Sequence, residues 1–284
     1  MVDTAEKSAV RAASTPAALS PAPTVPESPP VGAKLGRLIR TVAWRSAAVL
    51  IFLAIWQFAP TLGWADRTFL TPFSEVIRAL WELAVSGELW EDVSISLIRS
   101  LSGFFIAISV GVPLGLLIAW YRGVANFLNP LLTIFLNTAA VALLPVFVLI
   151  LGIDETSKIA IIAYACVWPV LYNTISGARN VDPLLIKSVQ SLGVKGPKLF
   201  QKVILPAALP TIFTGIRLAG AASILILITT ELVGAKAGLG YLISSSQYNF
   251  QIPQMYAGIV TVAAIGVGFN ALLVYLERRV SHGR

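Results

Sequence analysis

The residues best placed to do chemistry lie in a basic stretch from Val181 to Pro210, which separates two strongly apolar segments. Lys187, Lys198 and Lys202 supply cations there, and serine and glutamine side chains supply hydrogen-bonding groups. No nucleophile beside a base and no set of metal ligands accompanies them. The chemistry that these groups support is non-covalent docking of another molecule, so we predict that the stretch is a docking element.

A short helix is predicted at the start of this stretch. Asp182 can accept hydrogen bonds from the free amides of a first turn, and Pro183 at the first helical position loses no bond. Gly193 is expected to end the helix, because glycine adopts the left-handed conformation without steric penalty. Apolar residues recur at spacings that place them on one side of this helix: Val181, Leu184, Leu185, Val189 and Leu192.

A second short helical turn is expected after Gly196-Pro197. Lys198 and Lys202 fall on its polar side, opposite the apolar residues of the same turn. Pro206 and Pro210 are expected to end this turn before the next apolar segment begins.

Another kind of chemistry needs polar groups inside an apolar segment. Glu231 is such a group, and a charged side chain at the bilayer centre costs about 2.5–3.5 kcal/mol. It could line a gate or a solute path, or it could lie at the outer interface, since Gly234 and Lys236 follow closely. The other candidates for a translocation path, which could equally hydrogen-bond between helices, are Asn137, Thr138, Asn173 and Thr174.

Motifs for catalysis and nucleotide binding are absent from the sequence. No G-x-x-x-x-G-K-[ST] occurs, so the chain is not expected to bind ATP through a P-loop. The only histidine is His282, and no H-E-x-x-H or G-x-S-x-G is present. Cys166, the only cysteine, allows neither an internal disulfide nor a cysteine-cluster metal site, and it reads as a small core side chain. We predict no catalytic residue, no cofactor and no metal.

The composition is that of an integral membrane protein. Of 284 residues, 56% are hydrophobic and only 12% are charged, whereas a soluble domain has about a quarter charged residues. The mean hydropathy is +0.80. The formal net charge of +7 could suggest nucleic acid, but the basic residues stand at the ends of apolar segments, which favours a membrane topology signal.

Six apolar segments are predicted to cross the bilayer, each near the roughly 20 residues that a helical span needs. They are residues 46–62, 101–121, 128–151, 158–178, 208–234 and 256–276. Basic residues gather on one side of them: Lys34, Arg37, Arg40, Arg45, Arg122, Arg179, Lys187, Lys195, Lys198, Lys202, Arg278, Arg279 and Arg284. The positive-inside rule places that side and both termini in the cytoplasm, and the acidic region 66–92 outside.

Several features modify these spans. Gly111-x-x-x-Gly115 has the small-residue spacing that lets membrane helices approach closely. Pro113, Pro145 and Pro169 interrupt spans two, three and four, which fits either a translocation path or simple kinked packing.

The chain divides into residues 1–33, expected to be a disordered cytoplasmic tail, and residues 34–284, expected to form one transmembrane domain with a loop at 179–206. An amphipathic helix too polar to cross the membrane is predicted between spans one and two. Its apolar side would consist of Phe73, Ile77, Leu80, Trp81 and Ala84.

The loop from Lys187 to Pro206 resembles a signature of inner-membrane permease subunits of binding-protein-dependent ABC importers, E-A-A-x-x-x-G-x9-I-x-L-P. Here the loop reads K-S-V-Q-S-L-G, nine residues, then V-I-L-P. Gly193, Leu205 and Pro206 match, whereas the Glu-Ala-Ala triplet is replaced from Lys187 onwards. Further stretches of residues 45–280 look like the nitrate/sulfonate/taurine/bicarbonate branch: 72–76, 111–115, 173–174, 181–183, 205–210, 238–241 and 276–279.

The resemblance implies an all-α membrane protein of the type I ABC importer permease kind, with about six transmembrane helices and a cytoplasmic coupling helix. It implies a multi-pass subunit of the cell inner membrane that pairs with a second permease copy. Its other partners would be two cytoplasmic ATPase subunits and a periplasmic or lipid-anchored solute-binding protein. The residues implied to couple to the ATPase are Asp182, Pro183, Lys187, Ser188, Val189, Gln190, Gly193, Leu205 and Pro206.

Two other functions remain open at this point. A stand-alone ion-coupled carrier would usually show internal repeats and several ionisable residues near the midplane, and a membrane-bound enzyme would need a catalytic constellation. The resemblance implies transport, without enzymatic activity in this chain, of a small solute that is usually anionic or zwitterionic.

Overall fold

The computed structural model describes residues 47–281. The predicted tail 1–33, the basic residues from Lys34 to Arg45, and His282 lie outside this range. The chain divides into two compact units, Met1–Ala54 and Ile55–Arg284. A short apolar helix, Ala47–Phe58, covers the end of the first unit and the start of the second. The architecture below is that of the second unit.

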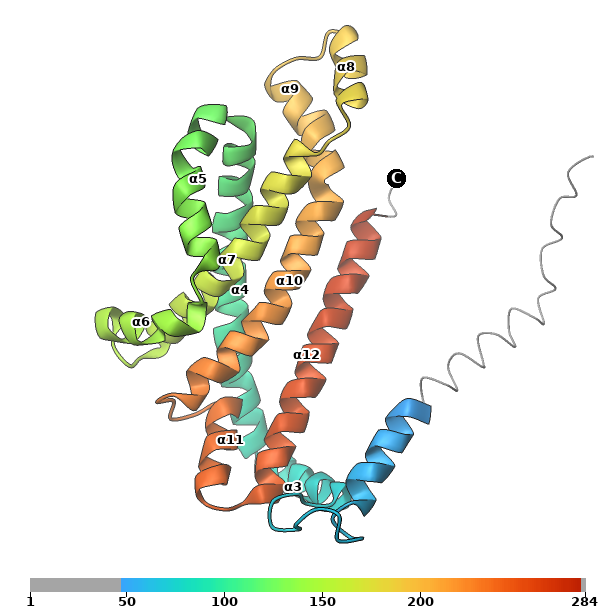
Figure 1. The fold of residues 1–284 in the computed structure, drawn as a ribbon, viewed down its shortest axis with the longest axis vertical. Coiled ribbons are helices and arrows are strands. Elements are labelled where there is room, and N and C mark those ends of the chain that lie inside the picture. The colour runs from blue at the N-terminus through green and yellow to red at the C-terminus, as the bar shows by residue number, and fades with distance from the viewer. Residues whose placement is uncertain (1–46, 282–284) are drawn as a thin grey trace, which may run out of the picture. The chain divides into compact units, whose positions relative to one another are not determined.

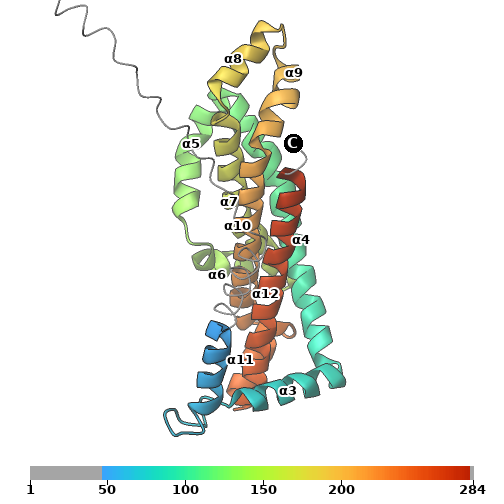
Figure 2. The same cartoon turned by 90° about the vertical axis from the view of Figure 1, so that its right-hand side faces the viewer.

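The second unit is built from helices, and residues 47–281 contain no strand, which confirms the all-α prediction (Figure 1). The helices are α3 (Phe73–Ser86), α4 (Glu88–Trp120), α5 (Arg122–Asn137), α6 (Leu144–Leu151), α7 (Glu155–Arg179), α8 (Pro183–Ser191), α9 (Pro197–Leu199), α10 (Leu205–Leu232), α11 (Leu239–Tyr248) and α12 (Ile252–Ser281). The helices α8 and α9 lie at one end of the long helices, which we call the loop end. The helices α3 and α11 lie at the other, which we call the far end (Figures 1 and 2).

Four helical stretches in the described range are long and apolar enough to cross a membrane: Glu88–Trp120, Glu155–Arg179, Pro197–Leu232 and Ile252–Arg279. They correspond to predicted spans two, four, five and six. The first predicted span, 46–62, is represented by the shorter helix Ala47–Phe58. The third, 128–151, is not one continuous helix, because its two halves meet at an angle of 91°.

The break in the third segment has a local cause. Thr138 adopts an extended conformation that ends α5, and Pro145 occupies the first turn of α6. Carbonyl groups in the last turn of a helix have lost their backbone partners and need others. The Asn137 amide donates to the carbonyl of Thr133 at 2.7 Å, and the Thr138 hydroxyl donates to that of Ile134 at 2.9 Å. These side chains satisfy the end of α5 and so stabilise the bend.

The remaining prolines do not interrupt their helices. Pro113 and Pro169 lie inside the continuous helices α4 and α7. The expectation that Pro206 and Pro210 end a turn before the next span is wrong, since both lie within α10. A π-helical turn, Phe200–Ile204, joins α9 to α10 and widens the backbone just before Pro206, where a proline would otherwise clash with the preceding turn.

The core of the unit is the close packing of α4 and α10 on either side of α7, which runs between them (Figure 1). Along α4, small residues face α7, and a Cβ added at Gly103, Gly111 or Gly115 would lie within about 3 Å of a side chain of α7. The close approach predicted from Gly111-x-x-x-Gly115 is therefore confirmed. Cys166 lies fully buried in the same core, as expected.

The helix α3 runs across the far end, where it packs against α12 (Figure 2). Its buried residues are Val76, Ala79 and Leu83. Of the predicted apolar side, Leu80 and Ala84 pack against the core cluster that contains these residues, whereas Trp81 is 71% exposed and Ile77 is also exposed. The helix carries apolar residues on two adjacent sides, and periodicity alone does not decide which side packs.

We predict that Gly115→Leu disrupts folding, because its Cβ would lie 2.7 Å from the Cβ of Thr174 and 3.1 Å from a backbone oxygen. Overpacking of this kind costs about 1–3 kcal/mol or more. Gly123→Leu is the matched control, since no atom lies within 4 Å of its added Cβ. Thermal unfolding in detergent should show a lower midpoint for Gly115→Leu alone. Equal midpoints would contradict the packing role.

Candidate functional site

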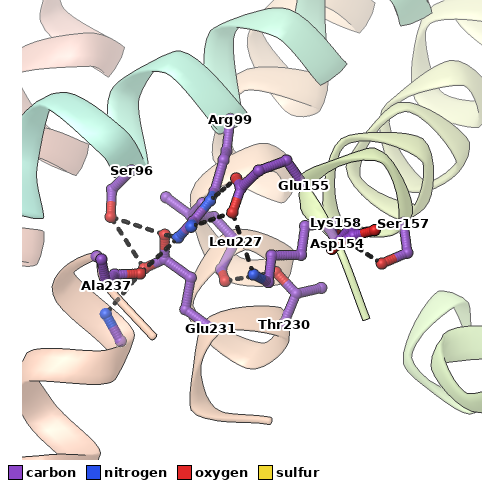
Figure 3. Close-up of polar contacts among 12 residues, drawn as sticks. Ser96, Arg99, Asp154, Glu155, Ser157, Lys158, Leu227, Thr230, Glu231 and Ala237 are labelled. Atoms are coloured by element: carbon purple, nitrogen blue, oxygen red, sulfur yellow. Dashed lines mark hydrogen bonds and ion pairs between the residues drawn. The ribbon is translucent and has the colours of Figure 1, made fainter. Parts of the chain in front are cut away.

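The far end contains a charged cluster that joins three of the long helices. Arg99 comes from α4, Glu155 and Lys158 come from α7, and Glu231 comes from α10 (Figure 3). The 33 residues of α4 extend about 50 Å, against about 30 Å of hydrocarbon. The helix is therefore longer than the hydrocarbon is thick, and part of it extends beyond the hydrocarbon.

Arg99 is the centre of the cluster. Its side chain is only 3% exposed, and its Nη1 donates to Glu231 Oε1 and to the carbonyl of Ala237, both at 2.7 Å. Its Nε and Nη2 form a two-pronged contact with the carboxylate of Glu155, in which Nη2 lies 2.6 Å from Oε1. One guanidinium thus connects α4, α7, α10 and the segment after α10, in the fork geometry that suits arginine.

Glu231 is fully buried, and its carboxylate is completely engaged. Besides Arg99, it accepts from the Ser96 hydroxyl at 2.8 and 2.9 Å and from the Gly240 amide at 2.8 Å. A Cβ at Gly240 would lie 2.5 Å from the Cβ of Glu231, and a Cβ at Gly238 would lie 2.5 Å from its Oε1. Both positions therefore need glycine for the backbone to come so close.

The segment between α10 and α11 is fixed from α4. Asp92 accepts from the Gly238 amide at 2.7 Å, and Ser96 accepts from the Leu239 amide at 2.9 Å. Gly238 has a φ of +112°, in the region that favours glycine. Side chains of α4 thus accept hydrogen bonds from the amides at the start of α11. These contacts explain why the backbone at Gly238-Leu239-Gly240 lies so close to α4.

Glu155 differs from Glu231 because its side chain is 57% exposed. It contacts the Lys158 ammonium at 3.4 Å, and Lys158 itself is buried. Both residues line a cavity of about 570 Å³ together with Arg99, Asp154 and Lys236. In the part of the chain that the structure describes, no group of three His, Cys, Asp or Glu side chains could hold a metal ion.

The loop end presents the predicted docking helix as α8. The Asp182 carboxylate accepts from the Leu184 amide at 2.8 Å, Pro183 is the first helical residue, and Gly193 has a φ of +83°. These features confirm the predicted start of the helix and the left-handed conformation predicted for Gly193, which follows it. The exposed residues of α8 include Lys187, Ser188 and Gln190, whereas Val189 is half-buried. The helix α10 begins with Leu205 and Pro206.

The apolar side of α8 is only partly covered. Ile186 and Val189 pack toward the core of the loop end, where Val181 is also buried. Leu184 and Leu192, by contrast, are 71% and 80% exposed. The predicted single apolar side is therefore divided between a packed part and an exposed part, and the exposed leucines are available to another molecule.

The structure does not bring the candidate path residues together. Asn137 and Thr138 lie at the end of α5, Thr174 is fully buried against Gly115, and Glu231 lies in the far-end cluster. The Asn173 amide donates to the carbonyl of Pro169 at 2.8 Å, four residues earlier. Their role in a path stays a prediction.

Sequence reasoning missed Arg99, Ser96, Glu155 and Lys158. The predicted spans began at residues 101 and 158, so these side chains were placed in loops or at their edges. Arg99 and Lys158 stand beside apolar spans on the side that carries most of the acids, where the positive-inside rule does not account for them. The position of Arg99 beside a span was the available signal that Glu231 has a basic partner.

We predict that Glu231→Gln lowers stability by about 3–5 kcal/mol, because it removes the fully buried partner of Arg99. Glu82→Gln is the control, since the Arg78–Glu82 pair is exposed and such pairs contribute about 0–1 kcal/mol. Denaturant unfolding of the purified chain measures both. Similar small losses for the two variants would contradict the structural role of the cluster.

Comparisons with known proteins agree with this architecture. Residues 111–282 match the family model described as binding-protein-dependent transport system inner membrane component. The chain is 34% identical over 239 residues to a putative aliphatic sulfonates transport permease protein of Bacillus subtilis, covering 84% of this chain and 87% of that protein. It is 31% identical over 253 residues to the taurine transport system permease protein of Escherichia coli, covering 87% and 92%.

Solved structures of the same fold include the MetNI methionine ABC transporter in inward-facing conformations. The TM-score is 0.53 at 18% identity, covering 73% of this chain and 97% of that one. An amino acid ABC transporter gives a TM-score of 0.54 at 20% identity, covering 70% and 97%. With the family match over residues 111–282, these findings identify the chain as a member of the inner-membrane components of binding-protein-dependent transport systems.

Proposed function

We propose that this chain is the membrane-spanning permease subunit of an ATP-driven importer, in which partner ATPase subunits move the spans through α8. The observation that carries the proposal is the capped helix α8, which connects two long core helices and exposes Leu184, with Leu192 exposed directly after it. Because α7 and α10 both pack closely in the core, a push on α8 acts on the whole α4–α7–α10 unit.

The proposed solute is a small anion or zwitterion. The relatives are named as permeases for aliphatic sulfonates, taurine and, in Synechococcus elongatus, bicarbonate, the last being 30% identical over 245 residues. These named solutes share a single small oxyanion group. Selection among them is proposed to rest mainly on a separate solute-binding protein.

The proposed assembly contains two copies of this chain, two cytoplasmic ATPase subunits and an external solute-binding protein. In this arrangement the loop end faces the cytoplasm. The basic residues support that orientation, since Arg179, Lys187, Lys195, Lys198 and Lys202 all lie at the loop end, near α8.

The two other functions considered from the sequence are not favoured. The relatives are named as transport permeases rather than enzymes. An ion-coupled carrier would need a carboxylate free to exchange a cation, whereas Glu231 is enclosed by Arg99, Ser96 and the Gly240 amide.

The orientation predicts which side of the membrane each helix faces. Single cysteines at Ser86, the last residue of α3, and Ser191, the last residue of α8, are introduced into a Cys166→Ser background. In intact cells an impermeant thiol reagent should label the cysteine at position 86, and the cysteine at position 191 should react only after the membrane is opened. The reverse pattern would overturn the orientation.

The docking role of α8 predicts that Leu184→Asp uncouples the assembled importer. A charge on a desolvated apolar contact weakens docking, and solute-stimulated ATP hydrolysis should fall about tenfold or more. Leu62→Asp is the control and should keep its activity, because Leu62 is a leucine of similar exposure, 61% against 71%, that lies outside α8. Unchanged ATPase rates for Leu184→Asp at normal assembly would count against the proposal.

A further inference from the structure

The cavity beside Glu155 has no role in the docking function described above. Its volume of about 570 Å³ falls within the roughly 300–1,000 Å³ range of small-molecule sites. It lies at the far end, where the proposed orientation brings the solute in. Isoleucine side chains line its wall together with five charged residues: Arg99, Asp154, Glu155, Lys158 and Lys236.

The charges around this cavity are unequal in burial. Two cations, Arg99 and Lys158, are buried, with side chains 3% and 8% exposed. In the described range 47–281, the equally buried acid in contact with them is Glu231. Two buried cations and one buried carboxylate leave one positive charge, and a buried charge needs a partner. In the structure that partner is Glu155, which is the most exposed member of the cluster.

The two carboxylates differ in how firmly they are held. Glu231 cannot leave, because Ser96 and the Gly240 amide hold it as well as Arg99. Among residues 47–281, the Glu155 carboxylate is held by Arg99 and Lys158. It is the first residue of α7 and follows a connection that contains Gly152, with a φ of +84°. Glu155 is therefore the carboxylate that another anion can replace, while Glu231 stays in place.

We propose that this cavity binds the oxyanion group of a small solute, such as a sulfonate, which replaces the Glu155 carboxylate on Arg99 and Lys158. This inference rests on the proposed transport of small anions. The guanidinium fork that now holds two carboxylate oxygens matches two oxygens of a sulfonate equally well, and Lys158 adds a second positive charge. Glu155 is then an internal competitor that keeps the cluster neutral when the cavity is empty.

The charge balance specifies the ligand class. A solute with one net negative group restores neutrality when Glu155 leaves. A cationic solute would meet two buried cations and would find Glu231 already engaged, so it should not bind. A neutral solute would leave one buried positive charge without a partner.

The test is equilibrium binding of ethanesulfonate to the full-length purified chain in nanodiscs, at constant ionic strength and without ATP. Removing the competitor should strengthen binding, so Glu155→Gln is expected to lower Kd about tenfold. Lys158→Gln should raise Kd by a similar factor. Glu82→Gln removes an acid from the same end but away from the cavity, and it should leave Kd unchanged.

Glu155→Asp is a second variant, in case Glu155→Gln loses stability. Its shorter side chain reaches Arg99 less well and should also strengthen ethanesulfonate binding. The proposal is overturned if both Glu155 variants bind ethanesulfonate no better than the wild-type chain, if neither they nor the wild type bind it, or if ethylammonium binds instead. Because no ATPase is present, these failures leave the importer function standing, whereas a failure of ATP-driven transport with intact anion binding would refute only that function.

Discussion

The burial of Arg99 between three helices is the interaction on which the far end depends. A guanidinium removed from water requires partners in every direction, and here they come from α7, α10 and the segment before α11. Glu231 can be buried only because Arg99 meets it, and the glycines at 238 and 240 are required because the backbone must close around that pair. One ionic contact thus determines helix positions and local sequence together.

The loop end is stabilised by different interactions from those at the far end. There α8 is held by an aspartate cap, a glycine stop and a few packed side chains, while leucines remain exposed. Between the ends, α4, α7 and α10 meet along glycines with little space for relative movement. In the proposed importer these three helices move as one body, because they are joined at the far end by Arg99 and connected to the proposed docking helix α8 at the loop end.

The sequence predicted the features that depend on local patterns. The cap at Asp182, the positive φ of Gly193 and the close approach at Gly115 follow from the conformational demands of single residues, and the structure confirms them. The bend after Asn137 and the burial of Arg99 depend on partners far away in the chain, which hydropathy does not report. The hydropathy of the sequence predicted one span where the structure has α5 and α6. It also placed Arg99 outside the predicted spans.

The distance between α7 and α10 within one protomer tests the central claim most directly. Spin labels on Tyr172→Cys and Leu225→Cys, both exposed positions, report it when labelled chains are diluted with unlabelled ones in the assembled importer. The account predicts the same distance distribution without nucleotide and with trapped ATP. A shift approaching one helical turn, about 5.4 Å, would show that the two helices slide past each other and would contradict a single moving body.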